Sequence, residues 1–229
     1  MQNSQELFDR FREDIVDVAT PYLWTDEEVL NYADDAYRMF VRLTGGIPDF
    51  TSDVTIIPLV TGEDIVDTDE SILRIMTATL ASTGADIEVV NATDLPLLFQ
   101  SSTDYGSLRT LSMKNMPGAV RWLVVGMQKY TAKVIQIPVV DDEINLYVYR
   151  LPLEHIVDGT HLLDDIMSDH HMHLIDWMKA RAYKKQDAET FDRTKSAEAE
   201  QDFRTYALQM KGEWERAKHK NRRVVYGGL

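Results

Sequence analysis

Hydrophobic residues near the beginning of the chain recur with the 3.6-residue period of an α-helix. This pattern predicts a first helix over about residues 4–19, which Pro21 ends because proline cannot continue a helix. Its apolar stripe comprises Phe8, Phe11, Ile15 and Val18. A second helix is predicted from residue 25, since Thr25-Asp26-Glu27-Glu28 has the order of a capping box and Gly45-Gly46 tolerates the positive φ of a helix end. The predicted buried face of this helix comprises Leu30, Ala33, Tyr37, Phe40 and Val41.

Farther along, the pattern changes to the two-residue alternation of β-strands. The predicted strands are residues 54–60, 72–80, 86–90, 119–125, 131–137 and 144–149. Pro58 places the first strand at a sheet edge or bulge, and residues 139–143 are predicted to be a hairpin loop between the last two strands. Residues 92–118 are rich in turn formers and predict a long surface loop with a short helix.

Helical periodicity returns after about residue 160 and predicts helices over about residues 170–184 and 188–218. The first stripe comprises Leu174, Ile175, Met178 and Ala182, and the second comprises Phe203, Tyr206, Ala207, Met210, Trp214 and Ala217. The sequence therefore predicts an α+β fold, in which N- and C-terminal helices form a bundle around an inserted antiparallel β-sandwich or barrel, with an extended C-terminal arm. The expected domains are residues 1–50, 51–158, 159–220 and 221–229.

Charge separates the chain into an acidic body and a basic tail. The net charge is −14, from 24 basic and 38 acidic residues, which argues against a nucleic-acid-binding surface over the whole protein. From residue 179 onward there are 13 Lys and Arg against 8 Asp and Glu, whereas the first 178 residues carry a net −19. The basic tail could contact phosphates, with Tyr226 stacking on a base, or dock on an acidic protein surface. The acidic body favours docking on protein.

Composition and local motifs argue against an enzyme. The absence of cysteine excludes disulfides, thiol nucleophiles and thiolate metal sites. No G-x-S-x-G, P-loop or dinucleotide motif is present, and the acidic residues at 63–70 lack EF-hand spacing. We therefore expect no catalytic residues and no cofactor. The N-terminal sequence does not resemble a signal peptide, and no apolar stretch approaches 18 residues, so no membrane anchor is expected.

The densest chemical cluster is the run at residues 169–173, Asp-His-His-Met-His, with Asp176 one turn later. His170 and His173 have the i, i+3 spacing that lets two imidazoles share a metal on one helix. The alternative is a helix start capped by Asp169, with histidines that stack or form hydrogen bonds. We favour this alternative and expect no metal site, with His170 and His173 as weak candidates.

Three stretches carry a family resemblance. They are residues 24–33 (WTDEEVLNYA), residues 121–152 from Arg121-Trp122-Leu123 to Tyr149-Arg150-Leu151-Pro152, and residues 173–227 from His173-Leu174-Ile175-Asp176-Trp177 to Arg223-Val224-Val225-Tyr226-Gly227. Together they resemble the head-to-tail adaptor (neck or connector) proteins of tailed bacteriophages. The histidine run at 170–173 and the loop at 92–118 depart from that family's pattern.

The resemblance implies a structural virion protein of the neck or tail, assembled in the host cytoplasm. It implies a homo-oligomeric ring, expected to be a dodecamer, that joins the portal protein to nozzle or tail proteins. The ring would line the DNA ejection channel and pass duplex DNA without sequence-specific binding. The residues expected to dock on the portal are Arg222, Arg223, Val224, Val225, Tyr226 and Gly227.

Two other functions stay open from the sequence alone. A receptor- or glycan-binding β module of a phage tail would expose aromatic residues on a strand face, and Tyr105, Tyr147 and Tyr149 are candidates. A metal-dependent hydrolase would use the Asp/His cluster at residues 169–176.

Overall fold

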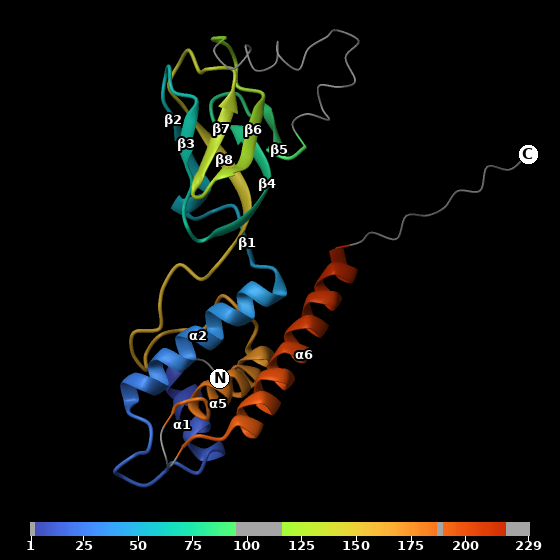
Figure 1. Cartoon of the computed structure of the whole chain (residues 1–229). Helices are drawn as coiled ribbons and strands as arrows, with labels where there is room; N and C mark the ends of the chain where they lie inside the picture. The colour runs from blue at the N-terminus through green and yellow to red at the C-terminus, as the bar shows by residue number, and fades with distance from the viewer. Residues whose placement is uncertain (1–2, 95–115, 187–189, 219–229) are drawn as a thin grey trace, which may run out of the picture. The chain divides into compact units, whose positions relative to one another are not determined.

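The computed structural model describes residues 3–94, 116–186 and 190–218 of the chain. The chain divides into two compact units (Figure 1). The helical unit combines residues 1–46 with residues 152–229, and the β unit spans Ile47–Leu151. Helices and strands thus lie in separate units, so the protein has the mixed α+β class expected from the sequence.

The helical unit contains segments from both ends of the chain. Its described helices are α1 (Ser4–Asp14), α2 (Asp26–Thr44), α5 (His171–Ala182) and α6 (Arg193–Lys218), with a 3-10 turn, η3 (Ser168–His170), directly before α5. Helix α5 contacts α1, α2 and α6, and α2 also contacts α6. The fully buried side chains of this unit include Leu7, Phe11, Tyr37, Phe40, Leu174, Ile175, Met178 and Phe203. No helix within the described ranges is both long and apolar enough to cross a membrane.

Helix α2 follows its sequence signals closely. Thr25 is the N-cap and forms the complete capping box with Glu28, which confirms the predicted helix start. Gly45 and Gly46 end the helix with φ values of +106° and +98°. The predicted buried positions are buried except Leu30, which is half-buried because the neighbouring Val29 occupies the core.

Helix α1 is shorter than predicted. It ends at Asp14 instead of about residue 19, so Val18 lies in a loop with 63% of its surface exposed. The buried face of α1 contains Leu7, which the predicted stripe omitted. Helix α6 likewise begins at Arg193 and not near residue 188. Along α6 the predicted stripe is fully buried at Phe203 and Ala207, whereas Tyr206, Met210 and Trp214 are half-buried. The side chain of Ala217, the last predicted position, lies outside the described part of the chain.

The β unit is one curled sheet. Its strands are β1 (Ile47–Asp49), β2 (Ile56–Leu59), β3 (Ile65–Asp67), β4 (Ile72–Leu80), β5 (Asp86–Asn91), β6 (Trp122–Gln128), β7 (Thr131–Ile135) and β8 (Asp142–Arg150). A short 3-10 turn, η1 (Asp53–Thr55), precedes β2. The strand order is β1-β8-β4-β5-β6-β7-β3, and β2 pairs with β8 as well. Strands β2 and β3 also approach each other, so the sheet curls around its core. Strand β2, which contains Pro58, pairs with β8 and with no other described strand, so it lies at an edge, as predicted.

Two predicted features of the strand pairing are wrong. The expected hairpin between the last two strands does not form, because β7 pairs with β6 and β3 whereas β8 pairs with β4, β1 and β2. The sheet is also not antiparallel throughout, since β5 and β6 are parallel. Parallel neighbours need a long crossover connection, which gives a physical reason for the long segment between Asn91 and Trp122. Residues 95–115 of that segment lie outside the described residues.

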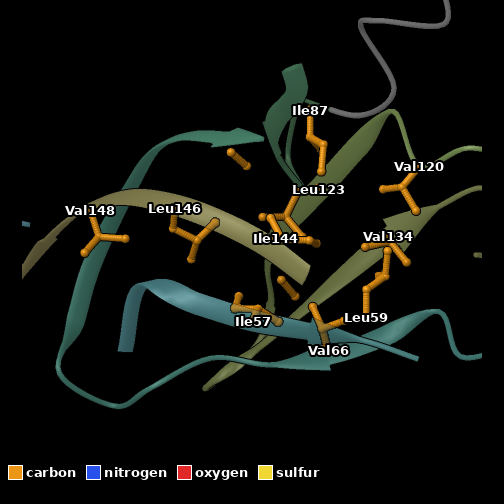
Figure 2. Packing of buried hydrophobic residues seen from close by; sticks show 12 residues of the cluster. Ile57, Leu59, Val66, Ile87, Val120, Leu123, Val134, Ile144, Leu146 and Val148 are labelled. Atoms are coloured by element: carbon orange, nitrogen blue, oxygen red, sulfur yellow. The ribbon is translucent and has the colours of Figure 1, made fainter. Parts of the chain in front are cut away.

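The core of the β unit is filled by aliphatic side chains that point inward from most of its strands (Figure 2). The labelled residues are Ile57, Leu59, Val66, Ile87, Val120, Leu123, Val134, Ile144, Leu146 and Val148. On β8 the inward residues alternate with Asn145 and Tyr147, as the two-residue period predicted. At the end of the strand, a buried ion pair joins Arg150 to Asp49 on β1. Burial opposes ionisation of Asp49, but hydrogen bonds from Arg150 and from residues 51 and 52 outweigh it and lower the pKa of this carboxyl.

Candidate functional site

A buried ion pair fixes the loop between α1 and α2. Arg12 Nη1 lies 2.8 Å from Asp17 Oδ2, and the two side chains are only 9% and 2% exposed. Arg12 Nη2 donates to the carbonyl oxygen of Trp24 at 3.1 Å and to Asp26 Oδ1 at 2.7 Å. Asp17 accepts in turn from the backbone N–H of Leu23. Both ends of the loop are therefore held by one guanidinium and one carboxylate.

Trp24 attaches the far end of this loop to α5. Its indole Nε1 donates to the carbonyl oxygen of Ala182 at 3.3 Å. Its ring makes edge contacts with Phe11 and with Tyr183, at centroid distances of 6.5 and 6.2 Å. The far end of the loop is thus fixed to α1 and α5 as well as to Arg12.

The loop begins with an unusual helix end. The N–H groups of Val16 and Asp17 donate to the carbonyl oxygens of Glu13 and Arg12, the pair of hydrogen bonds of a Schellman motif. The residue that must be left-handed in this motif is usually glycine, but here it is Val16, with a φ of +61°. A β-branched residue is strained in that conformation. Val16 is 80% exposed, so packing in the folded chain does not explain the choice.

The fixed loop displays a cluster of apolar side chains, which we call the loop patch. It comprises Val16, Val18, Tyr22 and Leu23. Their exposed fractions range from 39% to 80%, and Tyr22 also lies under the Arg12 guanidinium at 3.8 Å. Adjacent exposed apolar side chains on an ordered backbone are typical of protein contact surfaces.

A groove of about 820 Å³ lies beside the loop patch, and Tyr22 lines both. Its walls come from α1, α2 and the segment 155–159. The apolar lining comprises Phe8, Tyr22, Val29, Leu30, Ile156 and Val157, and the acidic lining comprises Asp9, Asp26, Glu27, Asp34 and Asp158. We call this feature the acidic groove. Its chemistry suits a ligand with both apolar and positively charged groups.

Hydrogen bonds fix the wall formed by segment 155–159. Asp34 accepts from the N–H of Ile156 at 3.0 Å and lies 2.8 Å from Nδ1 of His155. Hydrogen bonds from Thr160 lower the pKa of Asp158, so this carboxyl remains ionised at neutral pH. On the walls formed by α1 and α2, Asp9 and Glu27 are exposed, and neither forms an ion pair with another described residue. The groove therefore carries uncompensated negative charge.

The histidine run forms a packed cluster in which every ring contacts other protein groups. His170 Nδ1 lies 2.8 Å from the hydroxyl of Tyr206, whose ring stacks on His173 at a centroid distance of 3.4 Å. His171 Nε2 faces two backbone carbonyl oxygens. Burial is the main cause of the lowered pKa of His170. In the portions of the chain that the structure describes, no three His, Asp or Glu side chains are arranged to hold a metal.

Asp169 does not cap helix α5, contrary to the sequence-based expectation. The helix follows directly from the η3 turn, so His170 occupies the N-cap position and forms no side-chain capping bond. The preceding turn already satisfies the backbone at this helix start, which removes the need for an acidic cap.

The tyrosines expected on an open strand face are only partly available. Tyr149 is 9% exposed and Tyr147 is half-buried, and their rings lie 5.9 Å apart. Phe50, which the sequence analysis did not single out, contacts Tyr147 at 6.4 Å and is 71% exposed. Tyr105 lies outside the described residues. A flat aromatic platform for a sugar is therefore not formed by Tyr147 and Tyr149.

The acidic residues of the β unit form ion pairs and hydrogen bonds with residues that are distant in the sequence. Asp64 pairs with Lys133, and Asp141 accepts two hydrogen bonds from Thr61. Asp142 does the same for Ser82. These hydrogen bonds lower the pKa of both Asp141 and Asp142, and both residues lie at the surface, as expected from the sequence.

The acidic groove and the loop patch have no counterpart among the features expected from the sequence. Asp17 and Arg12 are five positions apart, which is not a helical pairing distance, so their ion pair gave no periodic signal. The predicted docking residues 222–227 lie outside the described residues, as does most of the predicted loop at 92–118.

Comparison with known proteins supplies the family. The family model described as SU10 adaptor protein matches residues 2–225. A comparison with curated proteins gives no match. The family match agrees with the resemblance to phage head-to-tail adaptors that the sequence carries. Since it covers nearly the whole chain, the protein belongs to the SU10 adaptor family of bacteriophage structural proteins.

Proposed function

We propose that this chain forms the head-to-tail adaptor ring of a tailed bacteriophage, joining the portal protein to the nozzle or other tail proteins. The observation that carries this proposal is the family match over residues 2–225. In this proposal the ring is a dodecamer of identical chains in the neck of the virion, assembled in the host cytoplasm. A ring of identical chains needs two different patches that meet, one on each neighbour.

The ring would also line the channel through which DNA leaves the capsid. The net charge of −14 suits this role, since a negatively charged wall repels phosphates and lets duplex DNA pass without binding. The proposal therefore includes no sequence-specific contact with DNA and no catalytic step.

The proposal also assigns a role to each part of the chain. Helices from both ends of the chain form a bundle, the β-rich segment is inserted into it, and the basic arm extends from the end of α6. The arm residues that would dock on the portal are Arg222, Arg223, Val224, Val225, Tyr226 and Gly227. Their order of charged and then apolar side chains suits docking on another protein.

Electron microscopy of intact particles tests the ring, which should appear as a collar at the unique vertex and fit twelve copies of this chain. A cheaper test mixes the chain with portal protein and measures the mass of the complex. A chain that ends at residue 220 should fold normally and fail to dock on the portal. Unchanged docking of that truncated chain would contradict the role of the arm.

A further inference from the structure

We propose that the acidic groove binds the basic C-terminal segment of a second copy of this chain. The inference deepens the proposed ring by naming one contact between neighbouring copies, and it rests on the proposed function only for the closure of that contact into a ring. The binding itself is a property of the isolated protein.

The residues that line the groove would complement an occupant that is both basic and apolar. Asp9 on α1 and Glu27 on α2 both line the groove, and no described cation pairs with either of them. Phe8 and Leu30 line the same groove, are half-buried, and present apolar surface to it. A polypeptide with adjacent Lys or Arg and aliphatic residues would neutralise the rim and cover this floor.

The C-terminal segment has this composition. Residues 216–223 contain three arginines and two lysines but no acidic residue, and Val224, Val225 and Tyr226 follow directly. Elsewhere the chain has a strong excess of acidic residues. The segment is therefore the part of this protein whose charge best complements the groove.

The basic residues of the C-terminal segment lie too close to the end of α6 to reach the groove of their own chain. Helices α2 and α6 run in the same direction (Figure 1), with Phe203 opposite Phe40 at a ring distance of 6.2 Å. From Phe203, α6 rises about 22 Å to Lys218, while the rim residue Asp34 lies about 9 Å before Phe40 on α2. The five residues from Lys218 to Arg223 span at most about 18 Å when extended, against a separation of about 31 Å. The arginines and lysines that would neutralise the rim must therefore come from another copy.

Such a contact joins two different patches and continues from copy to copy, as a ring requires. The arm residues proposed to dock on the portal are partly the same residues. The groove and the portal would then compete for one segment, so that portal binding releases the groove of a neighbouring copy.

Fluorescence anisotropy with a labelled synthetic peptide of residues 216–229 tests the contact on the full-length protein. The peptide should bind saturably at low salt and more weakly in 0.5 M NaCl, because the contact is largely electrostatic. The double variant Asp9→Asn/Glu27→Gln should weaken binding about fivefold or more. The matched control is Glu63→Gln/Glu70→Gln, which removes two exposed carboxylates from the β unit and should bind within twofold of wild type.

Sedimentation velocity of the full-length chain supplies the second readout. The wild-type chain should associate as its concentration rises, and Asp9→Asn/Glu27→Gln should shift this association to higher concentration.

The proposal is overturned if the peptide fails to bind, or if Asp9→Asn/Glu27→Gln binds the peptide as tightly as the wild-type chain does. It is also overturned if the peptide binds while the chain stays monomeric at every concentration, since the arm would then fold onto its own chain. None of these results depends on a collar at the vertex, so failure here and failure of the proposed function are distinguishable.

Discussion

Arg12 joins α1, the following loop and the start of α2 through a single side chain. Its partner Asp17 is nearly inaccessible, so removing that charge leaves a buried guanidinium with only the exposed Asp26 as a counterion. Asp17→Asn should therefore lower the free energy of unfolding by about 2–3 kcal/mol. Urea denaturation measures this change. Asp26→Asn is the control and should cost less than about 1 kcal/mol, since Asp26 is 89% exposed.

Val16 occupies a left-handed position that glycine adopts without strain. Because Val16 is 80% exposed, Val16→Gly removes strain and loses little packing. We expect the free energy of unfolding to rise by about 0.5–1 kcal/mol, measured as a higher midpoint of thermal unfolding. Val18→Gly, in the same loop but without positive φ, should lower stability; a fall of similar size in both variants would contradict the strain argument.

His170 makes stability depend on pH. Burial lowers its pKa below the usual 6.5; the nearby Asp169 and Glu213 raise the pKa, and His173 and His171 lower it further. The folded state therefore binds this proton less readily than the unfolded state does. The corresponding stability is present above pH 6.5 and is lost as the pH falls through the lowered pKa.

The variant His170→Gln isolates this contribution. Urea denaturation at pH 7 and pH 5 should show a smaller loss of stability on acidification in the variant than in the wild-type chain. Other groups, such as Asp176 with its raised pKa, titrate in both proteins and are removed by the comparison. An equal loss in both proteins would show that His170 does not titrate in this range.

Among the secondary-structure elements, α2 depends most visibly on its capping residues. The Thr25 hydroxyl accepts from the N–H of Glu28, and the Glu28 carboxylate accepts from the N–H of Thr25. Thr25→Ala should lower the free energy of unfolding by about 1 kcal/mol, because one helix donor loses its partner. Thermal unfolding measures the change, and Thr25→Ser should restore most of it. Full stability of Thr25→Ala would show that solvent replaces the cap.

Elements with strong local signals were predictable from the sequence, and the contacts between them were not. Strand β4 has the predicted bounds, and α2 has the predicted capping box, because alternation and capping are properties of neighbouring residues. The end of α1 was missed because Val16 stands where a glycine is expected. The partner of β8 was also missed, since alternating apolar residues identify a buried face but not the neighbouring strand.

The candidate site likewise combines features that the sequence predicts with contacts that it does not. Composition and charge order predicted a basic arm and an acidic body. The acidic groove needs α1, α2 and the segment 155–159 together, and more than a hundred residues separate that segment from the two helices. Only the assembled helical unit brings Asp9 and Glu27 to one groove.

For the molecule as a whole, the β unit has its two chain ends side by side. Ile47 on β1 pairs with Arg150 on β8, so both ends leave the sheet at neighbouring positions. We expect a fragment of residues 47–151 to fold by itself, since its core is formed by its own residues. Dispersed NMR amide signals and a cooperative thermal transition would establish this. A fragment with a collapsed spectrum would show that the unit needs the helical unit to fold.

The place of β8 in the sheet sets an order of events during synthesis. Strands β1 and β2 take their ladder partner from β8, which begins more than eighty residues after β2 ends. The sheet therefore closes only when residues 142–150 have left the ribosome. Until then, the early strands are open edges on a nascent chain, and pairings that span so much sequence form slowly. Conditions that slow translation or crowd nascent chains should therefore lower the yield of correctly folded β unit before they affect the helical unit.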